Sequence, residues 1–171
     1  MTGTVIVNIL RWLFLMALQI FVLNNIYLGG SFNPYLYVLI ILALPIELSA
    51  LAILSIGFCT GLILDLFGHT LGMHTMALTL LAFMRPKVLA LVSPRDGFEF
   101  GASVNVRDMG WSKYSVYTLL LIFPYHLLLF MLEGFSSGLF WLAVQKTVLN
   151  TLLTFVLILL VQMFSPLKDK S

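Results

Sequence analysis

The residues that could do chemistry are concentrated in the stretch GFCTGLILDLFGHTLG, which begins at Gly57 and ends at Gly72. Gly57, Gly61 and Asp65 recur every four residues, so they share one face of a helix. Glycine lets helix backbones approach closely in lipid, and a carboxylate on such a face is costly and usually functional. Gly68 and Gly72 follow in a glycine-punctuated turn. These five residues are candidates for helix packing or for binding a partner.

His126 lies within an apolar stretch, where an ionisable residue raises the hypothesis of a proton relay. A proton-coupled carrier or intramembrane enzyme would bring it together with Asp65 and Glu133 in one cavity. The alternative is a neutral, hydrogen-bonded histidine. His69 and His74 could form a metal site with Asp65, although zinc ligands usually group more tightly. The chain lacks the common hydrolase, zinc-protease and phosphate-loop motifs, so we expect no enzyme activity, no cofactor and no metal.

These residues belong to a chain of 171 residues that is 61% hydrophobic and 9% charged. A soluble domain carries about 25% charged residues, and several apolar runs here reach the roughly 20 residues that cross hydrocarbon as a helix. The net charge of +2 argues against a nucleic acid partner, and the single cysteine excludes an intrachain disulfide. The sequence predicts an all-α polytopic membrane protein that forms a single integral membrane domain over 1–171.

Six transmembrane helices are predicted. Pro45 divides the apolar tract 35–67, because proline ends or kinks a helix. The second span is then short, and it requires local bilayer thinning or burial among neighbouring helices. The last span carries a polar stripe suited to interhelical hydrogen bonds, formed by Thr147, Asn150, Thr151 and Thr154. The predicted spans cover 5–28, 34–45, 47–67, 71–92, 114–132 and 139–164.

The distribution of basic residues predicts the orientation in the membrane. With six spans, Arg11, the segment 85–113 and the C-terminal tail lie on one side, and lysine and arginine collect on the cytoplasmic side. Both termini and the loop 85–113 are therefore predicted to be cytoplasmic. Arg11 with Glu47, and Asp65 with Lys146, are candidate structural ion pairs because each pair lies at a similar predicted depth. The basic residues of the loop are Arg85, Lys87, Arg95, Arg107 and Lys113.

The stretch GFCTGLILDLFGHTLGMHTMALTLLAFMRP resembles the family of the bacterial rod shape-determining protein MreD. That family has a glycine-rich helix, an aspartate, a short turn, a glycine and a next helix rich in small residues. Gly57, Gly61, Asp65 and Gly72 match these positions. The sequence RPKVLALVSPRDGFE at 85–99 is similar to the continuation in Bacteroidetes-type members.

The resemblance implies a bundle similar to the S-components of energy-coupling-factor transporters, located in the bacterial inner membrane. It implies a non-catalytic membrane scaffold of the elongation complex, which supports lateral peptidoglycan synthesis and cell shape. Its partners would be MreC, the MreB filament, and the RodA glycosyltransferase with its class B penicillin-binding transpeptidase, in contact with membrane lipid. The alternative is a vitamin-binding transporter subunit, but its AxxxA docking face is missing from a first helix with Ala17 alone. The Pro45-Ile46-Glu47 segment departs from the basic turn of many family members.

Overall fold

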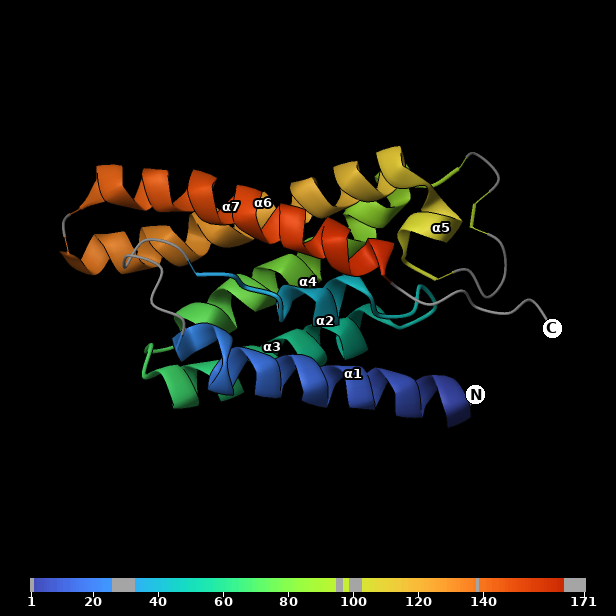
Figure 1. Ribbon diagram of the computed structural model, residues 1–171, viewed down its shortest axis with the longest axis horizontal. Helices are drawn as coiled ribbons and strands as arrows, with labels where there is room; N and C mark the ends of the chain where they lie inside the picture. Colours follow the sequence, from blue (N-terminus) through green and yellow to red (C-terminus); the bar gives the residue numbers. More distant parts are fainter. Residues whose placement is uncertain (1, 26–32, 95–96, 99–102, 138, 165–171) are drawn as a thin grey trace.

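The computed structural model describes residues 2–25, 33–94, 97–98, 103–137 and 139–164. Every regular element in these ranges is a helix, and the long helices follow the longest axis of the molecule (Figure 1). In chain order they are α1 (Thr2–Phe21), the 3-10 helix η1 (Leu23–Asn25), α2 (Val38–Leu42), α3 (Ala50–Gly68), α4 (Met73–Val92), α5 (Val106–Met109), α6 (Trp111–Ser137) and α7 (Phe140–Met163). The predicted all-α class is confirmed.

Four of the described helices, α3, α4, α6 and α7, are long and apolar enough to cross a membrane. The helix α1 contributes a shorter apolar stretch, Ile6–Phe21. Large apolar side chains such as Leu51, Phe83 and Leu152 remain exposed on these helices, which suits a surface in contact with hydrocarbon. The length and composition of the four helices indicate a membrane-embedded protein.

The four long helices pack as two hairpins, α3–α4 and α6–α7, which contact each other through α4 and α6. The helix α4 packs against α3 on one side and against α6 on the other, and α7 packs against α6. Figure 1 shows α3 and α4 running in opposite directions, and α6 and α7 doing the same. Leu78, Leu81 and Leu121 are fully buried in this core. The α3–α4 hairpin thus holds the Gly57 to Gly72 stretch against the rest of the bundle.

The predicted helical span over 34–45 is wrong in its extent, because the helix α2 covers only Val38–Leu42. Five residues rise about 7.5 Å, far less than a hydrocarbon core. Pro34 favours an extended backbone at the residue before it, and Pro45 disfavours a helix here because it lacks the N–H that a helical hydrogen bond would use. All five residues of α2 are buried, so this short segment lies among its neighbours rather than in lipid.

The other predicted spans correspond to observed helices with shifted ends. The span predicted at 47–67 begins instead at Ala50, because Ser49 Oγ accepts the N–H of Ala52 and caps α3. The helix α6 extends beyond its predicted bounds at both ends and continues through a proline. The spans predicted at 5–28, 71–92, 114–132 and 139–164 correspond to α1 with η1, α4, α6 and α7.

Candidate functional site

The face of α3 that carries Gly57 and Gly61 packs against α4 of the same chain. A Cβ atom at Gly57 would lie 2.8 Å from the Cβ atom of Ala82 and 3.1 Å from the carbonyl oxygen of Leu78. A Cβ atom at Gly61 would lie 2.7 Å from the backbone nitrogen of Thr75. The absence of side chains at both glycines therefore permits the close approach of the two helices.

The remaining two glycines of the stretch lie at the turn between α3 and α4. The backbone there is unusual, with φ values of 54° at His69, 48° at Leu71 and 88° at Gly72. Glycine adopts positive φ without steric cost, so Gly72 suits its place as the N-cap of α4. At Gly68 a Cβ atom would meet nothing closer than 3.5 Å. The turn brings the first residues of α4 back onto the end of α3.

The Asp65 carboxylate is bonded to this turn and to the first residues of α4. Its Oδ1 accepts the N–H of His74 at 3.0 Å and the hydroxyl of Thr70, and its Oδ2 accepts the N–H and hydroxyl of Thr75 at 2.8 and 2.6 Å. The first N–H groups of a helix have no partners within it, and Gly72 has no side chain to cap them. A carboxylate here also interacts favourably with the helix dipole. Asp65 therefore serves as the cap of α4 and fastens it to α3.

Both predicted ion pairs are wrong. Lys146 Nζ lies 2.6 Å from Glu133 Oε1, so Lys146 pairs across the α6–α7 hairpin and not with Asp65. Asp65 already accepts its hydrogen bonds from its own hairpin. Arg11 donates to a backbone carbonyl at 3.4 Å, and within the described ranges no ion pair joins it to the exposed Glu47.

The predicted loop 85–113 is helical at both ends. The placement of Arg85 in a loop is wrong, because this residue lies within α4 and its side chain is 0% exposed. The helix continues through Pro86, and membrane helices tolerate proline where neighbouring groups satisfy the freed backbone carbonyl. Of the other basic residues, Lys87 is in α4, Arg107 in α5 and Lys113 in α6, while Arg95 lies outside the described residues.

The segment 33–49, which precedes α3 and is buried over residues 34–42, donates hydrogen bonds at its start to the polar stripe of α7. The N–H of Asn33 donates to Asn150 Oδ1 at 2.7 Å. The N–H of Tyr35 donates to Thr154 Oγ1 at 3.4 Å. These two bonds join the stripe to a backbone that is not helical at this point, whereas the interhelical bond that its composition predicts is made by Thr151 to His126 of α6.

The end of α2 is held by donors from three other helices. The carbonyls of residues 42–44 accept, in order, Tyr117 Oη at 3.0 Å, Arg11 Nη1 at 3.4 Å, and Arg85 Nη2. Arg85 Nε also donates to Tyr117 Oη at 3.1 Å. Irregular backbone is tolerated at membrane depth only where it is buried in protein and its polar groups are bonded. These side chains therefore stabilise the broken segment, which is the stretch 33–49 with its single short helix α2.

His74 and His126 have different hydrogen-bond partners. His126 Nδ1 lies 3.1 Å from Thr151 Oγ1, and His74 Nδ1 lies 2.7 Å from Tyr37 Oη, which also bonds to Tyr125 Oη. In the part of the chain that the structure describes, no group of three or more His, Cys, Asp or Glu residues is placed to hold a metal. His126 therefore joins α6 to α7, and His74 joins α4 to the residue that precedes α2.

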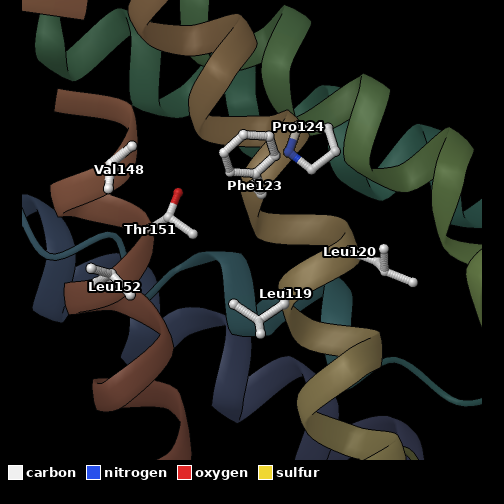
Figure 2. Close-up of a pocket in the computed structure, with 7 residues that line it drawn as sticks. All are labelled: Leu119, Leu120, Phe123, Pro124, Val148, Thr151 and Leu152. Carbon is white, nitrogen blue, oxygen red and sulfur yellow. The ribbon is translucent and has the colours of Figure 1, made fainter. Parts of the chain in front are cut away.

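Figure 2 shows an apolar groove beside Pro124, the proline within α6. Its volume is about 480 Å³, and its walls come from α6 and α7. Thr151 contributes a hydroxyl to this wall, and that hydroxyl is bonded to His126. The other lining side chains are apolar: Leu119, Leu120, Phe123, Pro124, Val148 and Leu152. The groove therefore suits hydrocarbon and carries no reactive group of its own.

Sequence reasoning missed three buried tyrosines, Tyr37, Tyr117 and Tyr125. A signal was available, because each lies within an apolar run and a buried tyrosine hydroxyl usually finds a partner.

Comparisons of the chain with protein-family models, with curated proteins and with solved structures find no match.

Proposed function

We propose that this chain is a non-catalytic membrane scaffold of the bacterial elongation complex, of the kind that the resemblance to MreD implies. In this role it supports lateral peptidoglycan synthesis and cell shape from the inner membrane. The observation that carries the proposal is the bonding of Asp65, the acidic residue of the family-like stretch. Its carboxylate accepts four hydrogen bonds from its own hairpin, so it stabilises a fixed helical unit.

The proposal includes six crossings, cytoplasmic termini and a bundle similar to S-components. Figure 1 places the start of α1, the end of α4, α5 and the end of α7 at one end of the molecule. The helix α3 begins towards the same end, so the chain returns through 33–49, which we assign as the second crossing. Lys87, Arg107 and Lys113 lie on elements at this end, which favours a cytoplasmic location for it.

The scaffold would contact two kinds of partner. The exposed apolar side chains of α1 and α7, such as Phe14 and Trp141, suit membrane helices of MreC or of the RodA–transpeptidase pair. The end that carries α5 would face the MreB filament. Membrane lipid covers the apolar surface that these proteins leave free. The buried polar side chains are not needed for these contacts, because they stabilise the bundle from within.

Depletion in the native rod-shaped organism tests this function. We expect depleted cells to become round or swollen, and re-expression of the wild-type chain to restore rods. Gly61→Leu should fail to restore them because it separates α3 from α4, whereas Gly68→Ala should restore them. Membrane levels of each variant are measured by immunoblot. Cells that remain rods after depletion, in an organism that needs lateral growth, would contradict the proposal.

A further inference from the structure

A second groove lies between α1, α3 and the segment that joins α2 to α3. Figure 1 shows α1 at the edge of the bundle, with α3 beside it. The volume of the groove is about 480 Å³, and apolar side chains make most of its wall, including Ile9, Leu48 and Ile56. Arg11 lines the same groove and is exposed. The groove therefore combines an apolar wall with one accessible cation.

Arg11 lies near mid-depth when α1 is the first crossing of the proposed arrangement. It is nine residues after Thr2 and ten before Phe21, the two ends of α1, so about 14–15 Å of helix extends on either side. Contact with α3 agrees, because Trp12 Nε1 donates at 2.9 Å to Thr60, near the middle of that helix. Arg11 is thus far from the helix ends, where long basic side chains place their charge among the headgroups.

The guanidinium of Arg11 has donors to spare. Its Nη1 donates to the Ala43 carbonyl at 3.4 Å, which is long for a hydrogen bond. A guanidinium carries five N–H donors, and among the residues that the structure describes no carboxylate forms an ion pair with this one. Ionisable side chains at membrane depth are costly and usually pair with one another. Arg11 therefore offers an accessible cation to an anion from outside the chain.

We propose that this groove binds a membrane-spanning helix of a partner protein, and that an aspartate or glutamate of that helix pairs with Arg11. The planar donors of arginine match the two oxygens of a carboxylate. Ser55 and Cys59 are exposed one turn apart on the α3 wall, and such small side chains let a helix backbone approach closely. The depth disfavours a phospholipid, because its phosphate stays about 15 Å from the bilayer centre. The inference rests on the proposed scaffold role for the presence of a membrane partner.

The test is disulfide cross-linking of the purified full-length protein to synthetic membrane-spanning helices in phosphatidylcholine nanodiscs. Each helix is apolar and about 20 residues long, with a central glutamate and one cysteine a turn before or after it. Cys59 is the single cysteine of the chain and lines the groove, so it reports occupancy. We expect the glutamate helix to cross-link at about tenfold lower concentration than a helix with glutamine in its place, because a hydrogen bond to a charged group is worth about that factor. Equal cross-linking of the two helices would overturn the proposed pairing.

Variants with matched controls separate the charge from the shape of the groove. Arg11→Gln should lose the preference for the glutamate helix, and Arg11→Glu should reverse it in favour of a lysine helix. Glu47→Gln, which removes an exposed charge from the turn before α3, should keep the preference. Ser55→Phe should block cross-linking because it fills the groove, whereas Ala17→Phe changes an exposed residue outside the groove wall and should not. Ser55→Phe decides the question if the Arg11 variants do not fold, and full cross-linking in that variant would overturn the proposal.

Two further results would overturn the choice of occupant. One is displacement of the glutamate helix by phosphatidylglycerol from the wild type but not from Arg11→Gln, because the cation would then serve a lipid. The other is a high yield of disulfide between two Cys59 residues without any added helix, because the groove would then bind a second copy of the chain. The probes are synthetic and cell shape is not measured, so failure here is distinguishable from failure of the scaffold role.

Discussion

Replacing Gly61 by alanine should separate α3 from α4. The new Cβ atom would lie 2.7 Å from the backbone nitrogen of Thr75 and 2.8 Å from the carbonyl oxygen of His74, whereas ordinary contact begins at 3.4 Å. The clashing atoms belong to the backbone, so no side-chain rotation relieves them. The Thr75 Cα atom lies closer still, so the helices must move apart by at least about 0.7 Å at this point.

The same movement weakens the cap of α4. The hydrogen bond from the Thr75 N–H to Asp65 would lengthen from 2.8 Å to about 3.5 Å, beyond the usual range for such bonds. Overpacking costs about 1–3 kcal/mol and a hydrogen bond to a charged group about 1.5–3 kcal/mol. The better helix propensity of alanine offsets about 1 kcal/mol. We expect a net loss of about 3 kcal/mol, or roughly 6–12 °C in melting temperature for a chain of this size.

The assay is thermal unfolding of the purified protein in one detergent, followed by tryptophan fluorescence. Gly68→Ala is the matched control, because it places the same methyl group on the same helix with 3.5 Å of clearance. Its melting temperature should stay within about 2 °C of the wild type. If Gly61→Ala and Gly68→Ala melt together, the glycine does not set the distance between the helices and the reasoning is refuted.

Three further variants test other side-chain hydrogen bonds and ion pairs. Asp65→Asn should lose about 2 kcal/mol of stability, because it removes the charge that caps α4, and unchanged melting would argue against that cap. Tyr117→Phe should lose about 1–3 kcal/mol, because it leaves a buried carbonyl and guanidinium without this hydrogen-bond partner; unchanged melting would contradict the role of Tyr117 in stabilising the end of α2. Glu133→Gln should change stability by less than about 1 kcal/mol because its ion pair is partly exposed, and a larger loss would show that the pair is a major contact.

Helical spacing was sufficient to predict the packing face of α3. Residues four apart must lie on one side of a helix, so Gly57, Gly61 and Asp65 could be grouped without coordinates. The long apolar runs likewise predicted the helices, because hydrocarbon requires that composition over that length. The partner of Asp65 could not be predicted from depth alone. It is the start of the next helix, reached through a turn with two non-glycine residues at positive φ.

The broken segment could not be predicted because its stability comes from distant residues. Its backbone is bonded by side chains of α1, α4, α6 and α7, including Arg85, Tyr117 and Asn150. The sequence around each of these residues gives no sign of its distant hydrogen-bond partner. The position of Arg85 before a proline and a lysine resembles the start of a polar loop. Only the assembled bundle brings the donors and the carbonyls together, so a reading along the chain misses the arrangement.

Isolation of the tagged chain from native membranes in mild detergent tests the proposed scaffold most directly. The co-purified proteins are measured by quantitative mass spectrometry against an unrelated tagged multi-pass protein. The proposal predicts strong enrichment of MreC, with RodA and its transpeptidase. Recovery of none of these above the control, with a tightly bound vitamin in the purified chain, would contradict it.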